Sequence, residues 1–420
     1  MSKICVLGMG YIGLPTALLF ANNGHEVVGV DVNPKVVESL KNGKMPFEEE
    51  GFQELLDNSI ANNTFRATTE VEEANTFLVA VPTPFDADLK MADLKYVISA
   101  CDMIHPHLNK GNLVIIESTI PPKTCENRVR QTLQRSGLKA PEDFHISHCP
   151  ERAIPGNTLY EMVHNDRVIG GIDKPSTEIT KELYLSFVKG NLYLTNNNTA
   201  EMIKLMENTY RDVNIALANE LAKISEDCGI NVWEAIDIAN KHPRVNIHKP
   251  GPGVGGHCIA IDPWFLTEDA KSSGLIMLSR QINDSMPVHV LGMVKEMING
   301  IDNPTITVFG VAYKGDIGDT RATPARKFIK LAEKEGYNVK IYDPYVKDFD
   351  YPILGLNEAV EGSDCIVILT DHSVFREMEP KNFYESMSNL NVLDTRNVIN
   401  TSYWSHFDFN INLIGKINQR

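Results

Sequence analysis

A glycine pattern close to the N-terminus, GMGYIG at residues 8–13, stands directly between a β-branched run at 3–7 and a helical pattern at 13–23. Glycine allows a tight turn at the first position, close approach of a pyrophosphate at the second, and close helix–strand packing at the third. The helix that follows would present free N–H groups and the positive end of its dipole to the phosphates. This pattern predicts a doubly wound α/β sheet whose first turn binds a dinucleotide.

An acidic residue at the end of the next strand completes this pattern. Asp31 closes the run EVVGV at 26–30, about 20 residues after the glycines, where its carboxylate is placed for the adenosine ribose. A carboxylate repels the extra phosphate of NADP, so NAD is favoured, although the nearby Lys35 supplies a positive charge. A flavin site or a chance glycine loop is the alternative. We expect NAD, held by Gly8, Gly10, Tyr11, Ile12, Gly13, Asp31 and Lys35.

Strands and helices alternate at both ends of the chain. Further strands are expected at 76–81, 112–117, 144–148, 305–311, 338–343, 365–370 and 391–394. This alternation predicts parallel βαβ units with helices on both faces of a sheet. VLGMGY at 6–11 is echoed by VFGVAY at 308–313, which suggests a second doubly wound sheet without the glycine fingerprint.

The middle of the chain carries a long helical pattern. Residues 199–227 lack Pro and Gly, Asn198 and Glu201 form a plausible capping start, and Gly229 stands at the C-terminal cap. So long a helix predicts a spine packed between domains or subunits, and another helix is expected at about 276–299. The expected fold is α/β, with two Rossmann-like doubly wound domains joined by a central helical domain: 1–198, 199–300 and 301–420.

Composition limits the partners. A net charge of −15 disfavours a nucleic-acid backbone, while 43% hydrophobic and 23% charged residues are normal for a globular protein. No apolar run approaches the ~20 residues that cross a bilayer, and no signal peptide pattern is seen. Seven scattered Cys without a CxxC pair favour free thiols in a reducing compartment. We expect a cytoplasmic protein with no metal, no nucleic-acid partner and no membrane insertion.

The most unusual segment is the glycine-rich run PGPGVGGHC at 250–258, which ends in a cysteine. Glycines let backbone approach a ligand closely. Cys258, preceded by His257 and followed by Asp262, is therefore a candidate nucleophile. The alternative, a small buried thiol, is preferred for the cysteines in apolar patterns, which are Cys5, Cys101, Cys125, Cys228 and Cys365. Cys149, in a loop beside Pro150, is left open.

Two other groups of polar residues are candidates. Lys204, Asn208 and Arg211 share one face of the long helix, and although such a face is usually only solvated, two cations on one stripe suit a diphosphate or an oxyanion. Other polar residues follow predicted strands, at the sheet edge where ligands bind in open α/β sheets. They are Thr83, Thr119, Glu151 and Arg152, each of which also has an ordinary turn or capping explanation.

Over essentially its whole length the chain resembles the UDP-glucose/GDP-mannose dehydrogenase family. The shared motifs are GMGYIGLPTA (8–17), VPTP (81–84), EST (117–119), CPER (149–152), AEMIKLMENTYRDVNIALANE (200–220), GPGVGGHCIAIDPWFL (251–266) and YKGDIGDTRATPA (313–325). The resemblance implies NAD-dependent oxidation of the C6 alcohol of a nucleotide sugar to a carboxylate. The segments NDRVIGG (165–171) and HPRVNI (242–247) point to UDP-N-acetyl-D-mannosamine, with UDP-GlcNAc and UDP-glucose as alternatives.

The resemblance also implies roles. Cys258 would be the nucleophile, Lys204 and Asn208 would stabilise oxyanions, Asp262 and a water would move protons, Glu151 would assist hydrolysis, and Thr119 would lie near the nicotinamide. Thr83 and Arg321 would also contact NAD. The UDP-sugar would be held by Glu151, Arg152, Ala153, Lys204, Asn208, Arg211, His242, Arg244, Gly255, Tyr313, Lys314 and Arg396. Family members commonly dimerise through the central helix, and Arg244 would then serve the partner's site.

The implied chemistry explains why a thiol accompanies NAD. An aldehyde has no geminal hydroxyl, so a nucleophile must add before a second hydride can leave. One rival is a redox-neutral NAD-dependent epimerase, which needs a Tyr-x-x-x-Lys pair that does not sit where expected in the first domain. The other is an NAD-sensing module, which leaves Lys204, Asn208 and Cys258 unexplained.

Overall fold

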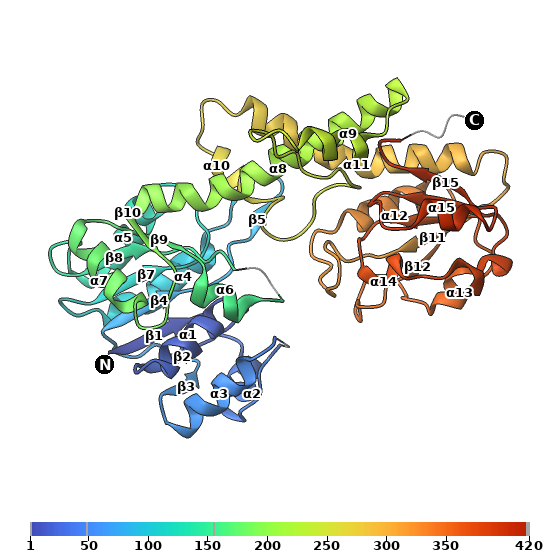
Figure 1. The fold of residues 1–420 in the computed structure, drawn as a ribbon. Helices are drawn as coiled ribbons and strands as arrows, with labels where there is room; N and C mark the ends of the chain where they lie inside the picture. The colour runs from blue at the N-terminus through green and yellow to red at the C-terminus, as the bar shows by residue number, and fades with distance from the viewer. Residues whose placement is uncertain (1, 48, 154–155, 417–420) are drawn as a thin grey trace. The chain divides into compact units, whose positions relative to one another are not determined.

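The structure is a computed structural model that describes residues 2–47, 49–153 and 156–416. The chain forms two compact units, Met1–Glu207 with Trp264–Asp269, and Asn208–Pro263 with Ala270–Arg420. Each unit is built around one sheet flanked by helices (Figure 1). The mixed α/β class and both doubly wound sheets expected from the sequence are confirmed.

The first unit contains an eight-stranded sheet in the order β10-β9-β8-β7-β4-β1-β2-β3. Six strands, β3-β2-β1-β4-β7-β8, have the doubly wound order of dinucleotide-binding sheets, with the strand order reversing between β1 and β4. Only β9 runs antiparallel to its neighbour β8. The bounds are β1 Lys3–Leu7, β2 Glu26–Val30, β3 Phe65–Thr68, β4 Thr76–Val79, β7 Leu113–Ile116, β8 His145–His148, β9 Arg167–Gly171 and β10 Leu192–Asn196.

Both faces of this sheet are covered. Alternate residues of β1 belong to different cores, Ile4 and Val6 to one and Cys5 and Leu7 to the other, as expected for a parallel sheet buried on both sides. The covering helices are α1 Gly13–Asn22, α2 Pro34–Lys41, α3 Phe52–Ala61, α4 Lys95–Ile104, a π-helical turn Cys125–Val129 with α5 Arg130–Leu133, α6 Thr158–His164 and α7 Lys174–Tyr184. A short hairpin, β5 Phe85–Asp86 and β6 Met91–Ala92, follows β4.

The second unit contains an all-parallel sheet in the order β12-β11-β13-β14-β15, the other common doubly wound order. Its strand order reverses between β11 and β13. The bounds are β11 Thr305–Phe309, β12 Asn338–Tyr342, β13 Cys365–Ile368, β14 Asn391–Asp394 and β15 Asn410–Leu413, with helices α12 Pro324–Lys334, α13 Leu356–Val360, α14 Ser373–Arg376 and α15 Thr401–Ser405.

The long helix, α8 Asn197–Cys228, is the expected spine, and Gly229 ends it with a positive φ of 69°. Its predicted capping start is wrong. The backbone N–H of Thr199 donates to Asn196 Oδ1 at 2.9 Å, whereas the Glu201 carboxylate accepts the backbone N–H of Cys125 at 2.9 Å. The Glu201 carboxylate therefore accepts a hydrogen bond from a neighbouring segment of the unit. This contact replaces the local capping box.

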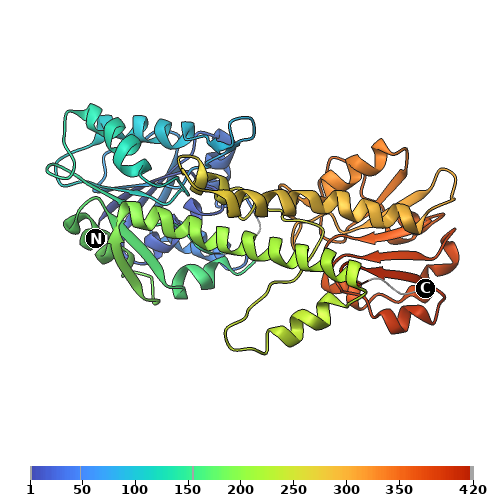
Figure 2. The same cartoon turned by 90° about the horizontal axis from the view of Figure 1, so that it is seen from above.

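In the second unit α8 is accompanied by α11 Gly274–Met297, and the two helices run side by side (Figure 2). α11 is the helix expected at 276–299. Two shorter helices, α9 Val232–Ala239 and α10 Asp262–Thr267, were not predicted. No helix in the described part of the chain combines the length and apolar character needed to span a bilayer.

Candidate active site

The glycine turn after β1 has the geometry that its sequence predicts. Gly8 has a φ of 95°, and a Cβ there would lie 2.5 Å from the Ala80 carbonyl oxygen. A Cβ on Gly13 would lie 1.9 Å from the Gly8 carbonyl oxygen, so α1 packs against the turn only because residue 13 has no side chain. A Cβ on Gly10 would meet nothing within 4 Å, which leaves this backbone open to a ligand.

Asp31 follows β2 beside this turn. Its Oδ2 accepts the backbone N–H of Met9 at 2.9 Å, and its Oδ1 accepts that of Asn33 at 2.8 Å. Each carboxylate oxygen can accept a second hydrogen bond, and the side chain is only half-buried. Asp31 therefore fixes the turn and keeps acceptor capacity for ribose hydroxyls.

Two threonines lie at the carboxyl ends of the neighbouring strands. Thr83, after β4, is buried, and its Oγ1 has no hydrogen-bond partner among the described residues. Thr119, after β7, is half-buried, and the preceding Ser118 Oγ donates to the Val81 carbonyl at 2.7 Å. A buried hydroxyl without a partner is costly, so Thr83 fits a site that a ligand completes. The side chains of Tyr11 and Lys35 are exposed, and Tyr11 stacks on Phe47 at 4.2 Å.

Glu151 and its neighbours form a polar cluster after β8. Glu151 is buried, and its Oε1 accepts the backbone N–H groups of Arg152 at 2.6 Å and Ala153 at 2.9 Å. The Arg152 guanidinium is held by Glu207 through contacts of 3.0 and 2.6 Å. The Arg152 side chain is therefore fixed in place by a carboxylate of its own unit. Ala153 contributes its backbone N–H to the cluster.

Lys204 lies half-buried on α8 in the first unit. Its ammonium acts on His148, the last residue of β8. Burial, together with the positive charge of Lys204, lowers the pKa of His148 to about 3. Neither ring nitrogen of His148 has a partner among the described residues. The basic group of Lys204 is thus within electrostatic reach of the carboxyl ends of the strands.

In the second unit the candidate nucleophile lies in the turn that precedes α10. Cys258 is exposed, and its carbonyl accepts the backbone N–H of Asp262 at 2.8 Å. The buried Asp262 Oδ2 accepts a hydrogen bond from Asn208 Nδ2 at 2.6 Å. Asn208 on α8 therefore contacts Asp262, which one backbone turn joins to Cys258.

The glycine loop that carries Cys258 rests on the segment after β11. A Cβ on Gly255 would lie 2.8 Å from Tyr313 Cβ, and the N–H of Gly256 donates to the Arg321 carbonyl at 3.0 Å. Asp319 holds the Arg321 guanidinium through contacts of 3.0 and 2.6 Å. Hydrogen bonding to Asp319 raises the pKa of Arg321, and Cys258 contributes to the same rise. Arg321 is accordingly a cation near the thiol.

The remaining predicted substrate residues of this unit lie nearer its surface. Arg396 follows β14, donates to Asp371 Oδ1 at 2.9 Å and lies directly over Gly251, where a Cβ would approach its Nη1 to 2.6 Å. The others are exposed: Arg211, His242, Arg244 and Lys314. Arg244 and His242 contact each other, with 3.5 Å between Nη2 and Nε2.

The other cysteines differ from Cys258. Cys149, left open from the sequence, is buried, and burial raises the pKa of its thiol to about 12. Cys5, Cys101, Cys125 and Cys365 are likewise buried. The expectation for Cys228 is wrong, because the last residue of α8 is exposed at the helix end.

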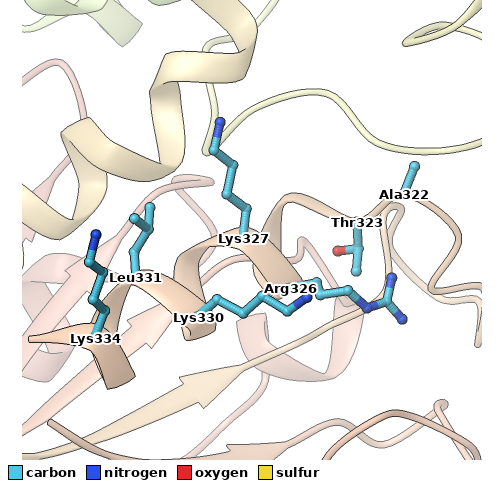
Figure 3. Close-up of a pocket in the computed structure, with 7 residues that line it drawn as sticks. All are labelled: Ala322, Thr323, Arg326, Lys327, Lys330, Leu331 and Lys334. Carbon is cyan, nitrogen blue, oxygen red and sulfur yellow. The ribbon is translucent and has the colours of Figure 1, made fainter. Parts of the chain in front are cut away.

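A pocket of about 430 Å³ lies along α12 (Figure 3). Four of its seven lining residues are cationic, and the full set is Ala322, Thr323, Arg326, Lys327, Lys330, Leu331 and Lys334. None of the predicted site residues is among them. The pocket is therefore a basic groove of the second unit, distinct from the residues described above.

A doubly wound sheet with this glycine turn and acid defines a dinucleotide-binding protein of the dehydrogenase class. The profiles of the UDP-glucose/GDP-mannose dehydrogenase family match nearly the whole chain: the NAD binding domain at residues 2–188, the central domain at 198–285 and the UDP binding domain at 307–401. The chain belongs to this family. It is an NAD-dependent dehydrogenase with an NAD-binding domain and a UDP-binding domain.

The relatives below match nearly the whole chain. A UDP-N-acetyl-D-mannosamine dehydrogenase of Methanococcus maripaludis is 49% identical over 98% of this chain and 97% of its own. The solved structure of the Pyrococcus horikoshii UDP-D-ManNAc dehydrogenase has a TM-score of 0.93 at 41% identity and covers 99% of both chains. The Staphylococcus aureus UDP-N-acetyl-mannosamine dehydrogenase Cap5O has a TM-score of 0.90 at 44% identity, covering 99% of this chain and 98% of its own.

Proposed function

We propose that the protein oxidises UDP-N-acetyl-D-mannosamine at C6 to UDP-N-acetyl-D-mannosaminuronate, with Cys258 as the nucleophile. The observation that carries the proposal is an exposed thiol one turn from the buried pair of Asn208 and Asp262, in a chain that also has an NAD turn. The names of the relatives support the sugar. Relatives named NDP-N-acetyl-D-galactosaminuronic acid dehydrogenase, at 41% identity, support other amino sugars as the alternative.

The residues of the first unit fit NAD. The open backbone at Gly10 and the positive end of the α1 dipole suit the pyrophosphate, Asp31 keeps acceptor capacity for the ribose, and the Thr83 hydroxyl has no partner among the described residues. When bound, NAD accepts one hydride in each of two oxidations. Thr119, at the end of β7, would then border the reacting carbon, and Tyr11, Ile12, Lys35 and Arg321 would complete the contacts.

Cys258 acts between the two oxidations. The first removes two electrons from the alcohol and leaves an aldehyde. The thiolate adds to the aldehyde carbon, a carbon–sulfur bond forms, and the oxygen takes a proton to give a thiohemiacetal. The second oxidation removes two electrons and leaves a thioester. Water then adds to the carbonyl carbon, the carbon–sulfur bond breaks, and its electron pair returns to the sulfur.

Charged and polar groups serve these steps. Lys204 and Asn208 donate to the oxygen that becomes negative when the thiolate or water adds. Asn208 is held by Asp262, which takes and returns protons beside Cys258. Glu151 takes a proton from the attacking water. The UDP-sugar is held by the other residues named for it, among them Arg152, Ala153, Arg211, Gly255, Tyr313, Lys314 and Arg396.

The test is the number of NADH molecules formed per molecule of limiting sugar. UDP-N-acetyl-D-mannosamine, UDP-GlcNAc and UDP-glucose are compared under excess NAD. Two NADH from the first sugar alone supports both the mechanism and the substrate. Two NADH from another sugar changes the assigned substrate and keeps the mechanism. No NADH from any of the sugars contradicts the proposal. A redox-neutral epimerase would release no NADH in any of the three assays.

Cys258→Ala should form no acid, because the aldehyde then has no thiol to add. Cys228→Ala is the matched control, since it removes the other exposed thiol, at the end of α8. Normal acid yield from Cys258→Ala contradicts the role of the thiol.

We also propose a homodimer formed through α8. Tyr210, Leu217 and Ile224 are 54%, 44% and 51% exposed and recur every seven residues, so they form one apolar stripe. Light scattering should give twice the mass of the chain, and His242 and Arg244, exposed in one copy, would then reach the partner's site.

Seven free thiols support a cytoplasmic location. We retain 1–198, 199–300 and 301–420 as functional domains, which the three family profiles support.

A further inference from the structure

The antiparallel strand β9 places an arginine directly opposite Glu151. Ser147 of β8 pairs with Gly171 of β9, and His148 pairs with Gly170. If this register is continued for three more residues along each of the two segments, Glu151 stands opposite Arg167. The other strands near the site end at this edge of the sheet, whereas β9 begins there. Its first residue is therefore available to the site.

The contact between the two side chains is short and buried. Arg167 Nη2 donates to Glu151 Oε2 at 2.5 Å and to the Met162 carbonyl at 3.2 Å. The guanidinium also lies 5.1 Å from the ring centroid of Tyr184 and 5.6 Å from that of Phe187, so its plane is confined by aromatic rings. A charge-assisted bond between a buried guanidinium and a carboxylate is strong and directional.

A second carboxylate completes the cluster. Glu117, the residue after β7, lies with its Oε1 3.8 Å from Arg167 Nη1. Its Oε1 accepts the Tyr184 hydroxyl at 2.5 Å, and its Oε2 accepts the Thr16 hydroxyl at 3.0 Å. Thr16 belongs to α1, the helix behind the glycine turn. The cluster therefore links the NAD turn to the end of β8.

We propose that Arg167 and Glu117 are positioning residues that hold the carboxylate of Glu151 in the orientation needed for hydrolysis of the thioester. Arg167 orients Oε2, while the backbone N–H groups of Arg152 and Ala153 fix Oε1. Glu117, with its Oε1 3.8 Å from Arg167 Nη1, keeps the guanidinium between the two acids. This inference rests on the proposed function, in which Glu151 takes the proton of the attacking water.

The cluster is better suited to holding the Glu151 carboxylate in place than to stabilising the fold. A buried ion pair contributes little net stability, since desolvation offsets the attraction between the charges. A cluster of two acids and one base in a dry site is therefore not explained as a stabilising device. It does prevent rotation of the Glu151 side chain, and a misplacement of about 1 Å in a reacting group can cost about a hundredfold in rate.

The test is Arg167→Lys, which keeps the charge and loses the planar fork. Both oxidations should still occur in the first turnover, while release of the acid slows about tenfold or more. Rapid mixing should then show a burst of NADH before a slow steady rate, and intact-mass spectrometry should show the acyl group on the protein. A merely structural defect would instead lower the burst and the steady rate in the same proportion.

Arg66→Lys is the matched control, because Arg66 is exposed on β3 and pairs with Glu72 at the opposite edge of the same sheet. It should leave burst and steady rate unchanged. Glu117→Gln and Tyr184→Phe keep the shape of the cluster, and they keep the inference testable if Arg167→Lys fails to fold. Both should slow acid release without changing KM for the sugar, Tyr184→Phe by the smaller factor.

Wild-type acid release in Glu117→Gln and Tyr184→Phe, or in a folded Arg167→Lys, overturns the positioning role. That failure is distinct from failure of the proposed function. If Cys258→Ala still forms acid, the thioester route itself is wrong. If Cys258→Ala forms none while the cluster variants behave as wild type, only the role of Arg167 and Glu117 is wrong.

Discussion

Replacing Asn219 with alanine is expected to loosen the loop that carries Cys258. Asn219 is fully buried on α8, and its Oδ1 accepts the backbone N–H of Gly251 at 2.9 Å. Its Nδ2 donates to Asn283 Oδ1 on α11, also at 2.9 Å. Asn283 in turn donates to Asp212 Oδ1 at 2.8 Å. The amide of Asn219 therefore joins two helices to the first glycines of the loop.

The loss in free energy of unfolding follows from the two groups that the substitution leaves without a hydrogen-bond partner. Alanine leaves the N–H of Gly251 and the Oδ1 of Asn283 buried and unpaired, at about 1–3 kcal/mol each. The better helix propensity of alanine offsets about 0.5 kcal/mol. The free energy of unfolding should fall by about 1.5–5.5 kcal/mol, with the lower values applying if water enters the vacated space.

The assay combines urea unfolding with the rate at which Cys258 reacts with a thiol reagent. The parent carries Cys228→Ala, so that Cys258 is the only exposed thiol. Asn219→Ala should lower the unfolding free energy and raise the reaction rate of Cys258. Asn214→Ala is the control, because among the described residues the Asn214 side chain bonds only to its own helix, through Tyr210 O at 2.8 Å. Stability within about 0.5 kcal/mol of the parent, with unchanged thiol reactivity, would refute the reasoning.

Two further predictions concern the first unit. Thr83→Val removes a buried hydroxyl that has no partner among the described residues, so the unliganded protein should gain about 1 kcal/mol while NAD binds more weakly; unchanged affinity by calorimetric titration contradicts a contact with NAD. Burial raises the pKa of Glu117 to about 7 from 4.5, against the opposing effect of Arg167 and with the help of Glu151. The folded protein then binds more protons than the unfolded one between these values, so wild type should lose stability relative to Glu117→Gln as pH rises from about 4.5 to about 7. Parallel denaturation curves for both proteins across that window test this; a constant difference contradicts it. Tyr184, Arg167, Glu151 and Cys149 face Glu117 in both proteins, so their contributions largely cancel.

The strands that could be predicted are those whose apolar runs are buried on both faces. Residues 3–7 and 26–30 match β1 and β2, because continuous β-branched runs leave little alternative. The strands that were not predicted include two of another composition. β9 (RVIGG) ends in two glycines, and β10 (LYLTN) is an edge strand with Tyr193 and Leu194 exposed. Their strand state comes from pairing partners, which local sequence does not reveal.

The same limit applies to the candidate site. Cys258, Asn208 and Asp262 could be proposed because unusual residues stand in contiguous motifs. The pairing of Arg167 with Glu151 could not, because it depends on the antiparallel register of β8 and β9. The segment at 165–171 contains Arg167, but its sequence alone indicates only a preference among sugars. A buried arginine at the start of a strand becomes informative once the strand's direction is known.

The two sheets repeat one turn yet differ in what that turn can bind. Gly310 has a φ of 84°, and the next residue, Val311, donates its N–H to Asp343 Oδ2 at 2.7 Å, as Met9 does to Asp31. Ala312 stands where the first turn has Gly10, so a methyl group fills the approach to the backbone.

The carboxylate of Asp343, moreover, already accepts hydrogen bonds from several groups of its own unit. Its Oδ2 also accepts the N–H of Ala312 at 3.2 Å and lies 3.1 Å from His372 Nε2, while its Oδ1 accepts the N–H groups of Tyr345 and Val346 at 2.9 and 3.0 Å. The buried acid closes the turn on itself and offers nothing to a ribose. A phosphate at this edge of the second sheet must therefore be bound by side chains that follow the strands, such as Lys314 and Arg396, rather than by the turn.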